Sequence, residues 1–439
     1  MQPLSGDEQR VVDLIDQDFA RDLEIAAVRI PSASFQEREV AQVFADHMEQ
    51  IGLEVKRLEV RHPFRQGVAT SQPVGVLRGT SAGPSLMLNA HMDHMPVLGK
   101  WADDPFSGEY RDGWILGRGA QDDKGGVVSA ITAAKALKES GVRFSGEIWV
   151  CPVAGHKSGC LGTKSLIEEG WTPDYCINAE NTAGGIAPIA VGFVMCEVVV
   201  RGRPAHFASS AEAKGRHSNA IDQIARIAVS LGDSLAYVGP RSWLTFEPHA
   251  GLPGYPAISL DKIQSSRHFP MVLEPDLEYF TARLSFQIRS VPGQTLQSIQ
   301  KDLVAHLQDV RTDYPALDVV AVNIPGEDPN YRGWDIPPFE TPSDSPLLMA
   351  LTGAYRSVLG SEPVVGAAPR LGAVGDGNVL AARGAEVVQY GPGDYRLFDS
   401  EPVVEERIAL HEITDCARVF AVTCLRLLSE PEELRPKAA

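Results

Sequence analysis

The feature that most constrains the fold is the alternation of short apolar runs with helical segments in the first half of the chain. Residues 85–90, 147–153 and 175–178 are nearly continuous apolar runs, as buried strands are. Residues 124–138 between the first two runs have helical spacing and many small side chains. Strands that alternate with helices predict a mostly parallel sheet covered on both faces, which is an α/β domain.

The middle of the chain has a different order of elements. Strand-like and helix-like patterns follow one another as strand-helix-strand-strand-helix-strand, which is the order of a ferredoxin-like α+β domain. A helix, a strand and a terminal helix then resume the first pattern. We therefore expect an α/β catalytic domain made of residues 1–191 and 328–439, with a ferredoxin-like α+β domain inserted at residues 192–327.

The charge balance excludes two classes of partner. The 439 residues include 40 Lys or Arg and 57 Asp or Glu, which gives a net charge of −17. Nucleic acid and anionic lipid both attract clustered basic residues, so we expect neither as a partner. The first residues lack the basic and apolar regions of a signal peptide, no apolar run reaches membrane-spanning length, and the six cysteines form no CxxC pair. We expect a cytoplasmic protein with reduced cysteines.

Three strand ends carry side chains that can bind a metal. His91 and Asp93 are two residues apart at the end of one predicted strand, so they face the same side, and Asp93 can fix the His91 tautomer. Asp122 and Asp123 precede a helix, where they either cap it or point at a metal. Glu180 follows a third strand. Active sites in such sheets lie at the carboxyl ends of strands, and one histidine with two carboxylates can hold a divalent transition metal.

Further motifs resemble a known family in their order and spacing. They are HMD at 91–93, GRGAQDDKGG at 117–126, the strand end at Glu180, GRPAH at 202–206, FQIR at 286–289 and GPG at 391–393. The chain resembles the metallopeptidase family of acetylornithine deacetylase, succinyl-diaminopimelate desuccinylase, aminoacylase and carboxypeptidase G. The resemblance implies a catalytic α/β domain, an inserted lid that dimerises, and two metals, usually zinc, bridged by one aspartate.

The resemblance also implies roles for individual residues. Asp122 matches the bridging carboxylate, and the Asp122–Asp123 peptide bond would be the cis bond of the family. His91, Asp122 and Glu180 match the ligands of one metal, with Asp93 as the residue that orients His91.

The other metal position departs from the family pattern. The catalytic glutamate of the family is replaced by His156 and the glutamate ligand after it by Lys157, and residues 391–401 contain no histidine. Because a protonated lysine repels a divalent ion, we expect one metal per subunit, held by His91, Asp122 and Glu180. Manganese, iron, cobalt and zinc are all compatible with these ligands.

A single metal can still activate water for hydrolysis of a C–N bond. His156 is then the expected general acid or base, and Lys157 either shares that role or stabilises negative charge. The best specific expectation is hydrolytic deamination of an aromatic amine with release of ammonia, as in a divergent branch of the family that acts on 5-nitroanthranilate. The alternatives are an amidohydrolase, deacylase or aminoacyl peptidase of the same family, and a catalytically silent binding protein.

The resemblance implies substrate-binding residues as well. His206 matches a lid histidine that reaches the active site of the partner subunit, so a homodimer or larger homo-oligomer is expected. Arg289 matches a lid arginine that binds a substrate carboxylate, with a surface salt bridge as the plainer alternative. Gly391 and Gly393 allow a close approach of backbone to substrate, although an ordinary turn needs glycine too.

Overall fold

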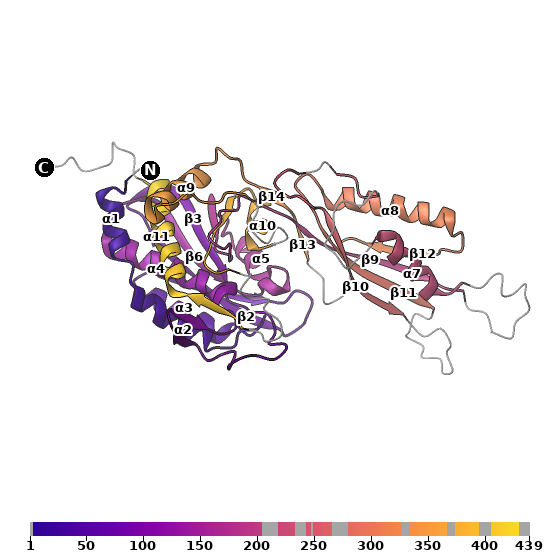
Figure 1. Cartoon of the computed structure of the whole chain (residues 1–439), viewed down its shortest axis with the longest axis horizontal. Helices are drawn as coiled ribbons and strands as arrows, with labels where there is room; N and C mark the ends of the chain where they lie inside the picture. The colour runs from indigo at the N-terminus through magenta and orange to yellow at the C-terminus, as the bar shows by residue number, and fades with distance from the viewer. Residues whose placement is uncertain are drawn as a thin grey trace, which may run out of the picture. The chain divides into compact units, whose positions relative to one another are not determined.

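The structure is a computed structural model, and it describes residues 3–203, 218–232, 243–246, 249–265, 280–326, 334–366, 374–394 and 405–429. The chain divides into two compact units (Figure 1). The first unit comprises Met1–Ala190 and Phe339–Ala439, and the second comprises Val191–Pro338.

A six-stranded sheet of order β1-β2-β6-β3-β7-β15 forms the centre of the first unit. β3 pairs in parallel with β6 and β7, and β15 pairs in parallel with β7. The mostly parallel sheet predicted from the sequence is thus confirmed, although β1 and β2 add an antiparallel edge that the apolar pattern did not predict. The strands are β1 (Glu54–Arg61), β2 (Ala69–Arg78), β3 (Ser81–His91), β6 (Ser145–Val153), β7 (Tyr175–Asn178) and β15 (Glu386–Gln389).

Helices cover both faces of this sheet. α4 packs against β3 and β6, α11 packs against α4 and α9 (Figure 1), and apolar side chains of these helices share one core with Leu86 and Leu88. Met87 belongs to a second core on the opposite face, where residues of α5 and α10 also lie. The helices are α1 (Gly6–Asp13), α2 (Gln17–Val28), α3 (Arg38–Gln50), α4 (Gly125–Ser140), α5 (Leu161–Glu168), α9 (Pro346–Leu359), α10 (Asp376–Ala381) and α11 (Leu410–Leu427).

The alternation of side chains along β3 determines on which face of the sheet His91, at the end of the strand, lies. Successive side chains of a strand point to opposite faces, so His91 lies on the same side as Met87 and Asn89. That is the side of α5 and α10. Among the described residues of this unit there are also five short strands: β4 (Glu109–Arg111), β5 (Trp114–Leu116), β8 (Ile189–Ala190), β14 (Phe339–Glu340) and β16 (Arg407–Ala409).

The second unit is the predicted α+β domain. Its main strands have the order β10-β11-β9-β12 and pair antiparallel, as in a ferredoxin-like sheet. β13 also pairs with β9, so this unit extends to Pro338 instead of ending at the expected residue 327. The elements are β9 (Phe193–Arg201), α7 (Ala220–Leu231), β10 (Ala257–Ser265), β11 (Thr281–Arg289), α8 (Leu296–Asp313), β12 (Val319–Asn323) and β13 (Asp335–Ile336).

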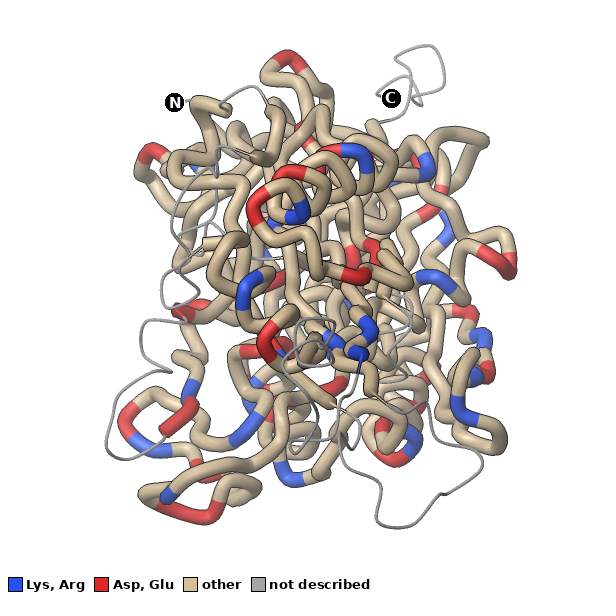
Figure 2. The backbone as a smooth tube through the Cα atoms, turned by 90° about the vertical axis from the view of Figure 1, so that its right-hand side faces the viewer, with Lys and Arg blue, Asp and Glu red and all other residues tan. Residues whose placement is uncertain are grey.

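Two further observations concern possible partners. Among the described residues, no helix is both long enough and apolar enough to cross a membrane. Basic and acidic residues are interspersed along the backbone in Figure 2, and the acidic ones are more numerous in the sequence.

Candidate metal centre

The site residues gather at the carboxyl edge of the central sheet. His91 ends β3 and pairs with Val153 at the end of β6, while Asn89 pairs with Asn178 at the end of β7. Parallel strands end at the same edge, so the segments that carry His91, His156 and Glu180 begin side by side.

A short turn brings Asp122 to this edge. The turn is the distorted helix η1 (Ala120–Lys124), in which Asp122 and Asp123 have non-helical backbone angles. The peptide bond between them is cis, as the family resemblance implies. Asp123 accepts a hydrogen bond from the backbone N–H of His91 (3.2 Å), which fixes the turn to the end of β3. Burial, followed by the nearby Glu180 and Asp122 carboxylates, raises the pKa of Asp123 well above its usual value.

His91 lies among three carboxylates. Its Nε2 atom is 3.0 Å from Asp122 Oδ1 and 3.9 Å from Glu180 Oε1, and its Nδ1 atom is 3.7 Å from Asp93 Oδ1. Glu180 Oε1 is buried and has no hydrogen-bond partner in the described part of the chain. A buried acceptor without a donor is expected where a ligand or ion completes the site.

Asp93 binds the turn that carries His156 and Lys157, the two residues that differ from the family pattern. Its carboxylate accepts hydrogen bonds from the backbone N–H groups of His156 (3.0 Å) and Lys157 (2.9 Å), and from the hydroxyl of Ser34. The 3.7 Å separation from His91 Nδ1 is longer than a hydrogen bond. The role of Asp93 in orienting His91 therefore stays a prediction, whereas its hold on the turn is direct.

Lys157 extends its ammonium group to the carboxylate of Asp122. Lys157 Nζ lies 2.8 Å and 3.1 Å from the two Asp122 oxygens and 3.3 Å from His91 Nε2. Burial alone would lower the pKa of Lys157, but the Asp122 and Glu180 carboxylates raise it above its usual value. Burial alone would raise the pKa of Asp122, but Lys157 and His91 hold it well below its usual range. Both groups are therefore charged, and they form an ion pair.

His156 packs directly on His91. It begins the short helix η2 (His156–Ser158), and the two imidazole rings stack with centroids 4.1 Å apart and an interplanar angle of 17°. His156 Nδ1 is 2.7 Å from Asp376 Oδ2 and 3.7 Å from Glu180 Oε1. Burial and Lys157 lower the pKa of His156, but Asp376 and Glu180 dominate and raise it well above its usual value.

Asp376 is the residue of this cluster that sequence reasoning missed. It is buried at the start of α10, more than 200 positions after His156 in the sequence. The only local signal was an aspartate between two glycines, Gly375 and Gly377, which reads equally well as a turn.

The side chains around His91 have the ligand chemistry of a divalent-ion site. His91 Nε2 lies 3.0 Å from Asp122 Oδ1 and 3.9 Å from Glu180 Oε1, and imidazole and carboxylate groups are ligands that a divalent transition metal accepts. The donor atoms of His91, His156 and Glu180 also lie within 4.8 Å of one another, but parallel stacked rings cannot both point a nitrogen at the same ion. The Lys157 ammonium contacts both carboxylate oxygens of Asp122, the residue that matches the bridging carboxylate of the family.

The remaining predicted site residues have different surroundings. A Cβ atom at Gly391 would lie 2.1 Å from the Ala179 carbonyl oxygen, and Gly393 has φ +95°. Backbone packing thus requires both glycines, and their contact with substrate stays a prediction. Arg289 ends β11 in the second unit, where its guanidinium lies 4.5 Å from the centre of the Phe193 ring. His206 lies outside the described residues.

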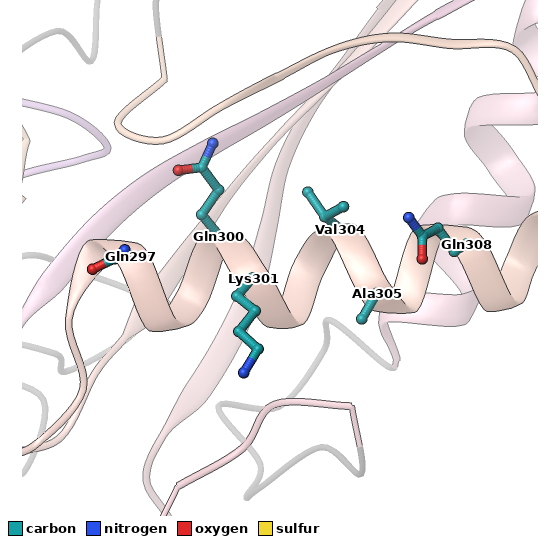
Figure 3. A pocket seen from close by; sticks show the side chains of 6 residues that line it. All are labelled: Gln297, Gln300, Lys301, Val304, Ala305 and Gln308. Atoms are coloured by element: carbon teal, nitrogen blue, oxygen red, sulfur yellow. The ribbon is translucent and has the colours of Figure 1, made fainter.

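A surface pocket lies along α8 (Figure 3). All of its lining side chains come from one helix, and they comprise three amides, one lysine and two small apolar groups. The pocket offers no carboxylate or histidine and is not a metal site. Its lining residues are Gln297, Gln300, Lys301, Val304, Ala305 and Gln308.

Comparison with known proteins agrees with this geometry. Residues 87–426 match the sequence profile of Peptidase family M20/M25/M40. The chain belongs to this family. The family resemblance predicted from the motifs is thus confirmed, and with it the assignment of the chain as an enzyme of a metal-dependent hydrolase family.

Relatives with named activities are hydrolases. N-formyl-4-amino-5-aminomethyl-2-methylpyrimidine deformylase of Bacillus subtilis (strain 168) is 25% identical over 393 residues, which cover 86% of each chain. Succinyl-diaminopimelate desuccinylase of Methylorubrum extorquens (strain PA1) is 32% identical over 220 residues, which cover 47% of this chain and 55% of the enzyme.

Solved structures show the same fold. Human carnosine dipeptidase 1 superposes with a TM-score of 0.69 at 20% identity. The alignment covers 98% of this chain and 100% of the dipeptidase chain. A dinuclear metal-binding peptidase of Bacillus subtilis from the M20 family has a TM-score of 0.62 at 15% identity, and the alignment covers 96% of this chain and 98% of the peptidase chain.

Proposed function

We propose that this member of the family hydrolyses a C–N bond of a small carboxylate-bearing molecule with a single divalent ion. His91, Asp122 and Glu180 would hold the ion, which is manganese, zinc, iron or cobalt. The observation that carries the proposal is the Lys157 ammonium 2.8 Å from Asp122, beside a histidine and a carboxylate that remain available to an ion. The site thus keeps one metal position of the family and replaces the other with a side-chain cation.

The divalent ion supplies an acidified water and a positive charge when it is bound. The chain's own residues complete the reaction. Lys157 stabilises negative charge that develops on the substrate oxygen or ring, in place of the second ion. His156 gives a proton to the leaving nitrogen, and Asp93 holds the backbone of both residues in place.

The preferred substrate class is an amide. The deformylase and the desuccinylase are named for removing an acyl group, and the deformylase matches 86% of this chain. Deamination of an aromatic amine is the second candidate. It is supported by the histidine and lysine that stand where the family has two glutamates, because that reaction needs a proton donor for the leaving amine but no second ion across a carbonyl.

We also propose that Arg289 binds the substrate carboxylate and that His206 contributes to the site of a partner subunit, which makes the protein a homodimer or larger homo-oligomer in the cytoplasm. These assignments rest on the family resemblance of their motifs. Gly391 and Gly393 would line the substrate path beside the turn of Asp122.

The test combines metal analysis with two substrate panels. We expect about one ion per subunit, turnover of N-formyl, N-acetyl or N-succinyl compounds or release of ammonia from aminobenzoates, and loss of turnover with a chelator. His91→Ala should lose both ion and turnover. His94→Gln is the matched control, because His94 is also buried but binds the Ser32 backbone N–H (2.8 Å). Absence of turnover with both panels in ion-loaded protein would contradict the proposal.

A further inference from the structure

A buried carboxylate holds the histidine that replaces the family's catalytic glutamate. Asp376 Oδ2 lies 2.7 Å from His156 Nδ1, whereas Glu180, the next carboxylate, is 3.7 Å from the same atom. Asp376 is 1% exposed. The 2.7 Å distance is that of a hydrogen bond between the Asp376 carboxyl group and His156 Nδ1.

Asp376 is fixed by the packing of α10. A Cβ atom on Gly377 would lie 2.8 Å from Val387 Cγ1, and one on Gly375 would lie 3.0 Å from Asn178 Nδ2. The start of α10 is therefore pressed against residues of β7 and β15. Asn378 Oδ1 also accepts a hydrogen bond from the Gly375 N–H (3.1 Å), which closes the first turn of the helix.

His156 is fixed independently from the other side. Its backbone N–H donates to Asp93 (3.0 Å), and its ring stacks on His91. The backbone of the histidine is therefore anchored at the end of β3, while its side chain is anchored by α10. Two separate parts of the fold determine the orientation of one imidazole.

We propose that Asp376 is the positioning residue for His156 and that the two form a dyad that replaces the glutamate base of the family. Asp376 accepts the Nδ1 proton, which selects one tautomer and leaves Nε2 as the ring nitrogen for proton transfer. The same arrangement of aspartate and histidine orients the base in serine hydrolases. The proton-transfer role rests on the proposed function, but the orientation of the ring does not.

Another use of the same residues is less consistent with the geometry. The donor atoms of His156, Cys160 and Asp376 lie within 4.8 Å of one another, and such a set can bind a cation. However, the 2.7 Å separation is that of a direct hydrogen bond, and ligands that share a divalent ion stand farther apart, at roughly 3–3.5 Å.

The experiment is nitrogen NMR of histidine-labelled protein together with kinetics of Asp376→Asn. His156→Gln identifies the His156 resonances among the 11 histidines. In the wild type we expect protonated Nδ1. In Asp376→Asn we expect an altered tautomer or protonation state, and a fall in kcat of about 10²- to 10⁴-fold with KM and metal content within about twofold of the wild type. Groups that face the His156 side chain are Asp376, Glu180, His91, Lys157 and Cys160.

Cys160→Ala is the matched control, because Cys160 Sγ lies 3.9 Å from the same nitrogen. It should leave the resonances, the metal content and kcat unchanged. A wild-type spectrum with unprotonated Nδ1 would overturn the dyad even if Asp376→Asn failed to fold. Loss of one metal equivalent in Asp376→Asn or Cys160→Ala would also overturn it, in favour of a cation site. The NMR result does not depend on turnover, so failure of the proposed function would be seen separately.

Discussion

Replacing Lys157 with methionine removes the cation that contacts Asp122 while keeping a side chain of similar length. Lys157 Nζ is 2.8 Å and 3.1 Å from the carboxylate oxygens, and the two side chains are only 18% and 8% exposed. Removal of one partner of a buried ion pair lowers the free energy of unfolding by about 3–5 kcal/mol, and the partial exposure of this pair reduces the loss to about 2–4 kcal/mol. The metal-free variant should therefore be less stable than the wild type by that amount.

The same change should strengthen metal binding. In the wild type, a divalent ion beside His91 competes with the Lys157 ammonium, which contacts Asp122 and lies 3.3 Å from His91 Nε2. The repulsion of a divalent ion and a unit charge about 4 Å apart is about 2 kcal/mol even with the dielectric constant of water. Because 1.4 kcal/mol is a factor of ten, we expect roughly a 30-fold gain in affinity.

The two effects are measured by urea unfolding of metal-free protein and by calorimetric titration with Mn²⁺ or Zn²⁺. Turnover should fall about 10²-fold, since the charge that stabilises the substrate oxygen is lost. Lys164→Met on α5 is the matched control, because it leaves the Lys157–Asp122 pair in place. Unchanged metal affinity together with unchanged stability in Lys157→Met would show that Lys157 neither pairs with Asp122 nor repels the ion.

Three further predictions concern single residues. Burial and the neighbouring Asp93 raise the pKa of Glu37 to about 7, so the folded protein binds more protons than the unfolded chain between about pH 4.5 and 7. The free energy of unfolding should therefore fall as the pH rises through this range. Measured by urea unfolding, the fall between pH 5 and pH 8 should be smaller in Glu37→Gln than in the wild type by roughly 3 kcal/mol, and an equal fall in both proteins would contradict the prediction. Glu180→Gln should lower the metal affinity by at least about tenfold in the same titration, and retention of full affinity would remove it from the ligand set. Arg289→Met should raise KM for carboxylate-bearing substrates by about 10- to 100-fold with little change in kcat, and an equal rise for substrates without a carboxylate would refute its assignment.

Much of the site could be predicted because parallel strands end at one edge. His91 and Glu180 each follow an apolar run, and the structure places both runs side by side in the sheet. The replacement of two family glutamates by His156 and Lys157 could also be read directly from the motif. The ion pair of Lys157 and Asp122 follows from their opposite charges, because the family motifs that carry them meet in one site.

The parts that could not be predicted depend on packing between distant segments. Asp376 meets His156 only because α10 packs against residues of β7 and β15, and no local pattern encodes that contact. The β1–β2 hairpin was missed because β1 is an edge strand rich in exposed charged residues, so it lacks the apolar pattern of a buried strand. The hydrogen bonds that Asp93 accepts from the backbone of residues 156–157 were not predicted either, because backbone donors leave no mark in a sequence.

If Lys157 replaces the second metal ion of the family, the active protein holds a single divalent ion in each subunit. The most direct measurement is the number of tightly bound divalent ions per subunit in active wild-type protein, determined by elemental analysis after titration to full turnover. One ion per subunit at full turnover is the predicted result. Two ions per subunit, or full turnover with none, would contradict it.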